Sequence, residues 1–226
     1  MVVSALIPAA GRGERMGGGV KKPFLLLDDK PIIVHTLSRF QRCDLIDEIV
    51  PIVSAEDIDR TWRIVGKYEF TKVTKVVPGG ETRQRSVYNG LRTLGERTDV
   101  VVIHDGVRPF VTDEIIRGCV KVAFKAGAAI AAVPVKDTIK EVSPEGIVLH
   151  TLERNRLWAI QTPQVFQKKL ILKAHEIALE RGIEATDDAA LVEMMGGKVH
   201  VIMGSYENIK ITTPEDLILA RALLCG

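Results

Sequence analysis

Residues 2–23 read V-V-S-A-L-I-P-A-A-G-R-G-E-R-M-G-G-G-V-K-K-P. The apolar run at 2–7 is typical of a short buried strand. The glycines that follow carry no Cβ, so they let the backbone approach a ligand closely. Backbone N–H groups presented in this way bind phosphate oxygens, and nearby basic side chains offset the charge. The basic side chains of the stretch are Arg12, Arg15, Lys21 and Lys22. We therefore predict a strand that leads into a triphosphate-binding loop, with a solvated surface loop as the alternative.

Two other phosphate-binding patterns do not fit this loop. The dinucleotide pattern G-x-G-x-x-G begins at Gly11 and Gly13 but meets Met16 where its third glycine belongs. The P-loop pattern needs Gly-Lys followed by Ser or Thr, but the Gly-Lys pairs of this chain are followed by Tyr68 and Val199. The sequence thus favours neither a Rossmann dinucleotide site nor a P-loop.

Composition limits the classes of partner. The 226 residues are 46% hydrophobic and 27% charged, as expected for a globular domain, with a net charge of only +2. This charge and 5% aromatic residues argue against a nucleic-acid partner, and no apolar run is long enough to span a membrane. The three cysteines lack metal-ligand spacing and look like free thiols. We expect one cytoplasmic domain over residues 1–226.

Strand and helix patterns alternate along the chain, which predicts an α/β fold with a doubly wound, mostly parallel, Rossmann-like sheet. The run at 99–105 is the most strand-like, and its β-branched residues suit a central strand covered on both faces. Further strands are expected at 2–7, 46–53, 73–77, 128–133, 198–203 and 208–212. Helices are expected at 55–66, 112–125, 168–181 and 187–195, and from about 31, 83 and 214.

Several polar residues follow predicted strands or begin helices. Two glycines at 79–80 precede a helix and make a second place where backbone can approach a ligand. Asp105 and Arg108 follow the central strand, and in open α/β sheets ligands bind beyond the carboxyl ends of strands. A buried carboxylate there needs a metal, a cation or donors. For His104, a functional and a structural role are equally supported. At 186–188, capping of a helix by Thr186 is favoured over a paired-carboxylate site.

A β-hairpin interrupts the alternation. Its strands, 138–142 and 147–152, flank a turn that contains Pro144 and Gly146. An isolated hairpin this apolar is not stable in water. We expect the arm, at about 136–156, to be buried against a second subunit in a homodimer.

Seven stretches together resemble one family, the 2-C-methyl-D-erythritol 4-phosphate cytidylyltransferases of the nucleotidyltransferase superfamily. In order they are P-A-A-G-x-G-x-R-M with Lys22, G-G-E-T-R-x-x-S, H-D-x-x-R-P, P-V-K-D-T, E-R-x-x-L-W-x-x-Q-T-P-Q, T-D-D-A and N-I-K-I-T-x-P-E-D-L. The resemblance covers essentially the whole chain. One departure is Gly106-Val107, where many members have two alanines.

The resemblance implies a reaction of the non-mevalonate isoprenoid pathway, in which CTP and methylerythritol phosphate give the CDP-alcohol and pyrophosphate with Mg²⁺. Arg15 and Lys22 would stabilise the transition state. Asp105 is a possible metal ligand beside an ion held mainly by the phosphates of CTP. The nucleotide would be held by Pro8, Ala9, Ala10, Gly11, Gly13, Gly80, Glu81, Arg83 and Ser86. The alcohol substrate and its phosphate would be held by Asp105, Arg108, Thr138, Arg154, Thr186 and Lys210.

Three alternatives stay open. A ribitol 5-phosphate cytidylyltransferase has the same architecture, although the R-x-x-L-W-x-x-Q-T-P-Q run favours the methylerythritol enzyme. Another sugar or alcohol nucleotidyltransferase fits the glycine loop but not the hairpin. A non-catalytic nucleotide sensor could keep the loop, but it would have no use for Arg154 and Lys210.

Overall fold

A computed structural model describes residues 1–11 and 21–225. In these residues the principal sheet has seven strands: β1 (Val3–Pro8), β4 (Glu48–Val53), β5 (Val77–Pro78), β6 (Val100–Ile103), β7 (Ala128–Pro134), β10 (Trp158–Gln167) and β11 (His200–Met203). The α-helices are α1 (Ile32–Arg42), α2 (Ile58–Lys67), α3 (Arg83–Thr93), α4 (Asp113–Ala126), α5 (Lys168–Glu180), α6 (Asp188–Met194) and α7 (Pro214–Cys225). The shorter elements are β2 (Leu26–Leu27), β3 (Lys30–Pro31), β8 (Lys140–Val142), β9 (Val148–Thr151) and the 3₁₀ turns η2 (Lys22–Phe24), η3 (Ala55–Asp57) and η4 (Arg154–Arg156).

The strand order across the sheet is β11-β7-β10-β6-β1-β4-β5. Strands β6, β1, β4 and β5 pair in parallel, and β11 pairs in parallel with β7. Among the described strands of this sheet, β10 alone runs antiparallel to its neighbours, β6 and β7. The order reverses beside β1, because the chain builds outward through β4 and β5 before it returns to β6 on the other side. Such a reversal point is where open α/β sheets bind ligands.

Both faces of the sheet are covered by helices, as the doubly wound prediction requires. Ala5 and Ile7 of β1 pack in one core with α1, α2 and α4, whereas Leu6 packs in a second core with α3, α5 and α6. Successive strand side chains point to opposite faces, so continuous apolar strands feed both cores. All four residues of β6 are fully buried, which confirms that it is a central strand.

The structure differs from the sequence-based assignment at three strands. Residues 73–77, expected as a strand, contribute only an isolated bridge at Val73 and the start of the two-residue β5. Residues 158–167, which no pattern marked as a strand, form the ten-residue β10. Residues 208–212, expected as an alternating strand, are irregular. The alternation there still has a structural meaning, because Ile209 and Ile211 pack in a third core with α7 while Lys210 turns towards Asp105.

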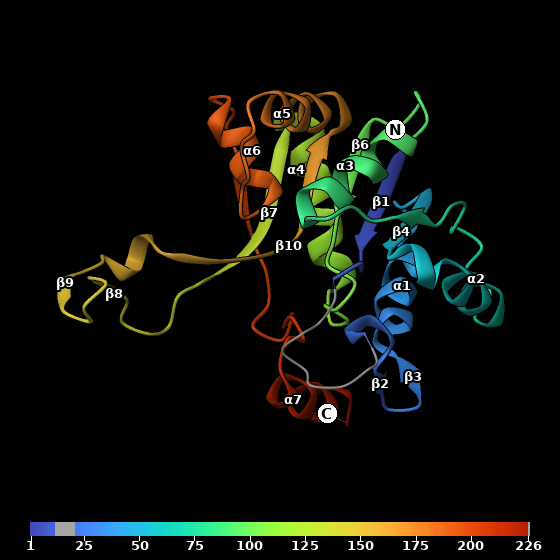
Figure 1. Cartoon of the computed structure of the whole chain (residues 1–226), viewed down its shortest axis with the longest axis horizontal. Helices are drawn as coiled ribbons and strands as arrows, with labels where there is room; N and C mark the ends of the chain where they lie inside the picture. Colours follow the sequence, from blue (N-terminus) through green and yellow to red (C-terminus); the bar gives the residue numbers. More distant parts are fainter. Residues whose placement is uncertain (12–20, 226) are drawn as a thin grey trace.

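The expected hairpin is present and stands away from the sheet (Figure 1). Strands β8 and β9 pair only with each other in the described chain, and all of their residues are exposed. The arm leaves the sheet at the end of β7 and returns at the start of β10. Val135 N–H donates to the Leu157 carbonyl at 3.0 Å where the two ends of the arm meet. We name residues 135–157 the arm.

Crossing a bilayer takes a helix of about 20 apolar residues. The longest helix within 1–11 and 21–225 is α4, with 14 residues. In this part of the chain, therefore, no helix has the length and apolarity that a membrane crossing requires.

Candidate active site

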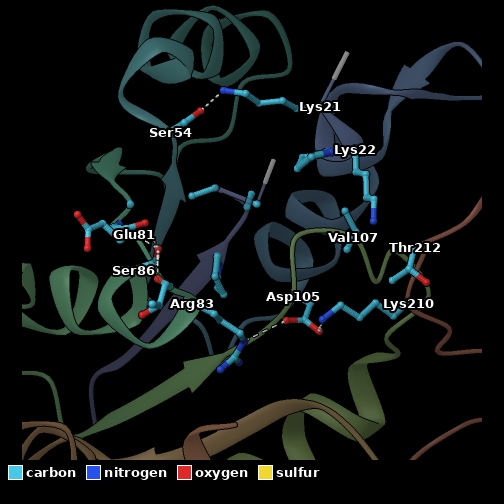
Figure 2. Close-up of a pocket in the computed structure, with 18 of the residues that line it drawn as sticks. Lys21, Lys22, Ser54, Glu81, Arg83, Ser86, Asp105, Val107, Lys210 and Thr212 are labelled. Carbon is cyan, nitrogen blue, oxygen red and sulfur yellow. Dashed lines mark hydrogen bonds and ion pairs between the residues drawn. The ribbon is translucent and has the colours of Figure 1, made fainter. Parts of the chain in front are cut away.

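A cavity of about 1190 Å³ opens at the carboxyl ends of β1, β4, β5 and β6, beside the reversal point of the sheet (Figure 2). Its lining comes from segments far apart in the sequence. They include Pro8, Ala9, Ala10, Gly11, Lys22, Gly80, Glu81, Arg83, Ser86, Asp105 and Lys210. Eleven residues named from the sequence therefore meet in one cavity.

The first wall is the backbone that follows β1. Ala9 N–H donates to the Ile52 carbonyl at 2.7 Å, and Gly106 N–H donates to the Pro8 carbonyl at 3.0 Å. A Cβ added at Gly106 would lie 2.9 Å from the Ala9 Cβ, closer than carbon atoms normally approach. The glycine at this departure from the family pattern therefore suits the close approach of the two segments. Gly13 and Arg15, also expected at this wall, lie outside the described residues.

Lys21 and Lys22, the first residues of the second described range, have different surroundings. Lys21 Nζ is bound to Asp57 at 2.6 Å and to Glu56 and Ser54. Lys21 also lines the cavity, where its charge is paired at the turn after β4. Lys22 lines the cavity and, with Lys210 and Val107, lies across from Glu81 and Ser86 (Figure 2).

The second wall is the loop before α3. Ser86 Oγ accepts a hydrogen bond from Gly80 N–H at 3.0 Å and donates to the Thr82 carbonyl at 2.9 Å. Thr82 caps α3 by accepting from Arg85 N–H. A Cβ at Gly80 would lie 2.5 Å from the Arg85 Cβ. A side chain at residue 80 would thus force the loop open, so glycine and Ser86 together fix its shape.

Asp105 lies on the floor of the cavity, just beyond β6. In the described part of the chain three cations surround its side chain, which is 9% exposed. Lys210 Nζ lies 3.0 Å and Arg108 Nε 3.3 Å from Oδ2, and Arg83 Nε lies 3.7 Å from Oδ1. Arg83 and Lys210 reach Asp105 from opposite sides (Figure 2). Burial acts to raise the pKa of Asp105, but Lys210, Arg83 and Arg108 overcome it and lower the pKa to about 2.

Arg108 lies next to Asp105, outside the cavity, and holds the Asp105 turn in place. It is absent from the cavity lining among the described residues, and its Nη1 donates to the Asn208 carbonyl at 2.7 Å. It therefore joins the turn after β6 to the segment that carries Lys210. Burial lowers the pKa of Arg108, although Asp105 acts against this. Arg108 therefore contacts Asp105 but does not line the cavity.

His104 has a structural environment. Its ring is fully buried, with Nδ1 3.1 Å from Thr162 Oγ1 and Nε2 2.9 Å from the Arg108 carbonyl. Burial is the main cause that lowers the pKa of His104 to about 4. The ring is therefore neutral at pH 7, and it ties β10 to the turn that carries Asp105.

Three of the residues expected to bind substrate lie apart from the cavity. Thr138 and Arg154 are exposed on the arm, where Arg154 Nη1 donates to the Lys136 carbonyl at 3.0 Å. Thr186 is exposed before α6. The expected helix cap at Thr186 is wrong: Asp187 caps α6 by accepting from Ala190 N–H at 2.9 Å, because the helix begins at Asp188 and residue 187 therefore occupies the cap position.

The described residues of the cavity offer few side chains that could bind a metal ion. Within the described residues, no group of three or more His, Cys, Asp or Glu side chains could hold an ion. Asp105 supplies a carboxylate on the cavity floor, and Mg²⁺ commonly binds through one or two carboxylates together with substrate phosphates. The residues present fit an ion that is held mainly by a bound nucleotide.

Comparisons with known proteins cover essentially the whole chain. A family model described as 2-C-methyl-D-erythritol 4-phosphate cytidylyltransferase matches residues 3–225. A relative of that name from Desulforamulus reducens is 51% identical over 98% of this chain and 95% of its own. The solved 4-diphosphocytidyl-2C-methyl-D-erythritol synthase from Anaerococcus prevotii is 36% identical, with a TM-score of 0.89 over 100% of this chain and 96% of that one. A solved 2-C-methyl-D-erythritol 4-phosphate cytidylyltransferase from Thermus thermophilus is 31% identical, with a TM-score of 0.83 over all of both chains.

Proposed function

The chain belongs to the 2-C-methyl-D-erythritol 4-phosphate cytidylyltransferase family, and we propose that the cavity at the sheet's reversal point is its active site. It is an enzyme that transfers a cytidylyl group from CTP to 2-C-methyl-D-erythritol 4-phosphate in isoprenoid biosynthesis. The observation that carries the assignment of the site is the single cavity shared by the backbone after β1 and the cation-surrounded Asp105.

The two walls suit different parts of the reactants. The triphosphate of CTP lies against Gly11, with Lys22 neutralising charge on the reacting phosphorus, and the resemblance assigns Gly13 and Arg15 to the same part of the nucleotide. The cytosine lies against the second wall at Gly80 and Ser86, where Pro8, Ala9, Ala10, Glu81 and Arg83 complete the nucleotide site. Positioned cations of this kind stabilise charge that develops in the transition state.

The polyol phosphate binds on the other side, at Asp105 and Lys210. An Asp105 with a pKa of about 2 is ionised at pH 7, so it accepts hydrogen bonds from polyol hydroxyls and has no proton to give. The attacking group is a phosphate oxygen, which is already ionised at this pH, so it needs no general base. The engagement of both His104 nitrogens fits a reaction without one.

The proposal includes Mg²⁺ bound chiefly to the CTP phosphates, with Asp105 as its protein ligand. The ion supplies further neutralisation of phosphate charge. Asp105 shares its oxygens with Lys210 and Arg83, so this chain's part is to hold the carboxylate in place until the nucleotide arrives.

We also propose a homodimer joined through the arm. Val142, Ile147, Val148 and Leu149 are about half exposed or more, and apolar surface of this kind is typical of contacts between subunits. In a twofold dimer the arm would carry Thr138 and Arg154 to the neighbour's phosphate pocket. Thr186, exposed just before α6, is assigned to the same substrate by the resemblance alone.

A cytoplasmic location completes the proposal. Cys43 and Cys119 are buried and unpaired, and burial raises the pKa of their thiols to about 11 and about 12. Such thiols are inert, and the exposed Cys225 is also free, which fits a reducing compartment.

Pyrophosphate release tests the substrate assignment. The purified protein is assayed with CTP and Mg²⁺ against methylerythritol phosphate and against ribitol 5-phosphate, and then with UTP or GTP in place of CTP. We expect turnover with CTP and methylerythritol phosphate to exceed each other combination at least tenfold, because a site that hydrogen-bonds one substrate rejects analogues that leave its polar groups unpaired. Equal turnover of GTP and CTP would contradict the cytosine site, and preference for ribitol phosphate would replace the acceptor.

A further inference from the structure

Arg83 connects the cavity floor to a carboxylate that does not line the cavity. Its Nε lies 3.7 Å from Asp105 Oδ1, and its Nη2 lies 2.7 Å from Asp188 Oδ2 on α6. Both carboxylates contribute to raising the pKa of Arg83 against the opposing effect of burial. One guanidinium is therefore held at two points, of which one belongs to the proposed active site and the other to the protein interior.

Asp188 is enclosed on every side. It is 1% exposed, its Oδ1 lies 3.1 Å from His175 Nε2 on α5, and its backbone N–H donates to Gln164 Oε1 on β10 at 3.1 Å. Burial acts to raise the pKa of Asp188, but Arg83 and His175 lower it overall. A carboxylate this deep is costly unless it is paired. The pairing with Arg83 therefore offsets part of the cost of burying the Asp188 carboxylate.

The two distances from Arg83 differ in a way that bears on substrate binding. At 2.7 Å the guanidinium is in direct contact with Asp188, whereas at 3.7 Å it is too far for a hydrogen bond to Asp105. Oδ1 of Asp105 thus remains able to accept from a substrate hydroxyl. Without the charge on Asp188, Arg83 would be drawn to the nearest remaining carboxylate, Asp105, and would occupy that oxygen.

We propose that Asp188 is a positioning residue for the polyol phosphate: by holding Arg83, it keeps Oδ1 of Asp105 open to a substrate hydroxyl. His175 fixes the opposite side of the Asp188 carboxylate and so limits its rotation. This inference rests on the proposed function, because it assumes that Asp105 meets the polyol. It adds a residue that touches neither substrate and lies 83 positions from Asp105 in the sequence.

The first test compares Asp188→Asn with Glu193→Gln, a control at an exposed position of the same helix. The Michaelis constants for polyol phosphate and for CTP are measured separately at saturating partner substrate, together with kcat and the melting temperature. We expect Asp188→Asn to raise KM for the polyol phosphate about tenfold and KM for CTP by a clearly smaller factor, because Arg83 also belongs to the proposed nucleotide site. Glu193→Gln should change either KM by less than about twofold.

The second test is a double-mutant cycle with Arg83→Gln. Because Asp188 is proposed to act through Arg83, adding Asp188→Asn to Arg83→Gln should change KM for the polyol phosphate by less than about twofold. An effect of the same size in both backgrounds would mean that Asp188 acts on the fold alone and would overturn the proposal. Equal rises in both Michaelis constants would overturn it too.

Two controls keep the outcome decisive. If Asp188→Asn does not fold, Asp188→Ser, which is smaller and also neutral, replaces it; failure of both to fold would make Asp188 a purely structural residue and end the proposal. Wild-type protein that does not release pyrophosphate from CTP and methylerythritol phosphate would instead refute the proposed function. The wild-type assay thus separates the two failures.

Discussion

Asp105 in the cavity and Arg154 on the arm are assigned to the same substrate, the polyol phosphate, but their surroundings are opposite. Asp105 is buried, lies beyond a central strand and is surrounded by cations from α3, from its own turn and from residue 210. Arg154 is exposed on a hairpin that pairs with no other described strand, and its bond there is to the Lys136 carbonyl. On the proposed assignment, one chain holds the polyol side of the site ready at Asp105, whereas the contacts that the arm makes with the phosphate would come from a second chain.

The largest effect is expected inside the cavity. Lys22→Ala should lower kcat about 10²- to 10³-fold, because it removes a charge aimed at the reacting phosphorus. Lys21→Ala is the matched comparison, since Lys21 is bound to Asp57 and Glu56, and it should cost less than about tenfold. Steady-state kinetics on folded proteins measure both. If Lys21→Ala costs as much as Lys22→Ala, the two lysines do not divide their roles as the geometry indicates.

The next effect concerns the stability of the cavity floor. His104 has a pKa of about 4 when folded, against a usual value of 6.5. Between these two pH values the His104 imidazole is protonated in the unfolded chain but neutral in the folded protein. The free energy of unfolding therefore decreases as the pH falls from about 6.5 to about 4. The loss is about 3 kcal/mol. Urea unfolding at pH 7.5 and 4.5 measures it, and His104→Gln should remove most of the difference. An unchanged difference in the variant would assign the pH dependence to another group.

Asp105 titrates in a separate window and does not interfere with this measurement. Its pKa is lowered to about 2 when folded, so its contribution to stability is complete above the usual value of 3.8 and is lost as the pH falls from there towards 2. An unfolding series carried below pH 4 should therefore show a second loss of stability. Lys210→Met, which removes the cation with the largest effect on Asp105, should shrink that second loss.

The smallest effect is expected on the arm. Arg154→Ala should raise KM for the polyol phosphate about tenfold without lowering the melting temperature, because Arg154 is exposed and a charge-assisted phosphate contact is its proposed role. Arg156→Ala, on the same turn and also exposed, is the control and should behave like the wild type. A lowered melting temperature in Arg154→Ala alone would point to a role in holding the arm together.

Mixing the two variants asks which subunit Arg154 serves. Lys22→Ala and Arg154→Ala proteins are unfolded, refolded together and assayed well below KM. If Arg154 acts on the neighbour, each mixed dimer has one site with both defects and one with neither. Random pairing makes half the dimers mixed, so about a quarter of wild-type activity should return. If Arg154 acts on its own chain, every site keeps one defect and activity stays at the average of the two variants.

Local patterns were sufficient for most of the sheet. Parallel strands alternate with helices, and each strand is a continuous apolar run that can be recognised without knowing its neighbours, as β6 illustrates. β10 could not be recognised in this way. Gln161, Thr162, Pro163 and Gln164 interrupt its apolar pattern, and its pairing with β6 joins residues about 60 positions apart.

Local sequence patterns also predicted only part of the candidate active site. Asp105 was found because it follows a strand, and the glycine loops because glycine has a local meaning. Asp188 carries no such signal, since its partners Arg83 and His175 come from other helices and its position beside a helix start suggested capping. Charge pairing across the interior is fixed by the packed fold, so no short window of sequence contains it.

The position of the arm has a consequence for how the fold can diversify. Its two ends leave and re-enter the sheet side by side, where Pro134 of β7 pairs with Trp158 of β10. Everything between them can change in length or sequence while β7 and β10 keep their register. The arm is thus an insertion between two paired strands, and on its proposed roles one segment would govern both subunit assembly and acceptor choice, apart from the nucleotide site.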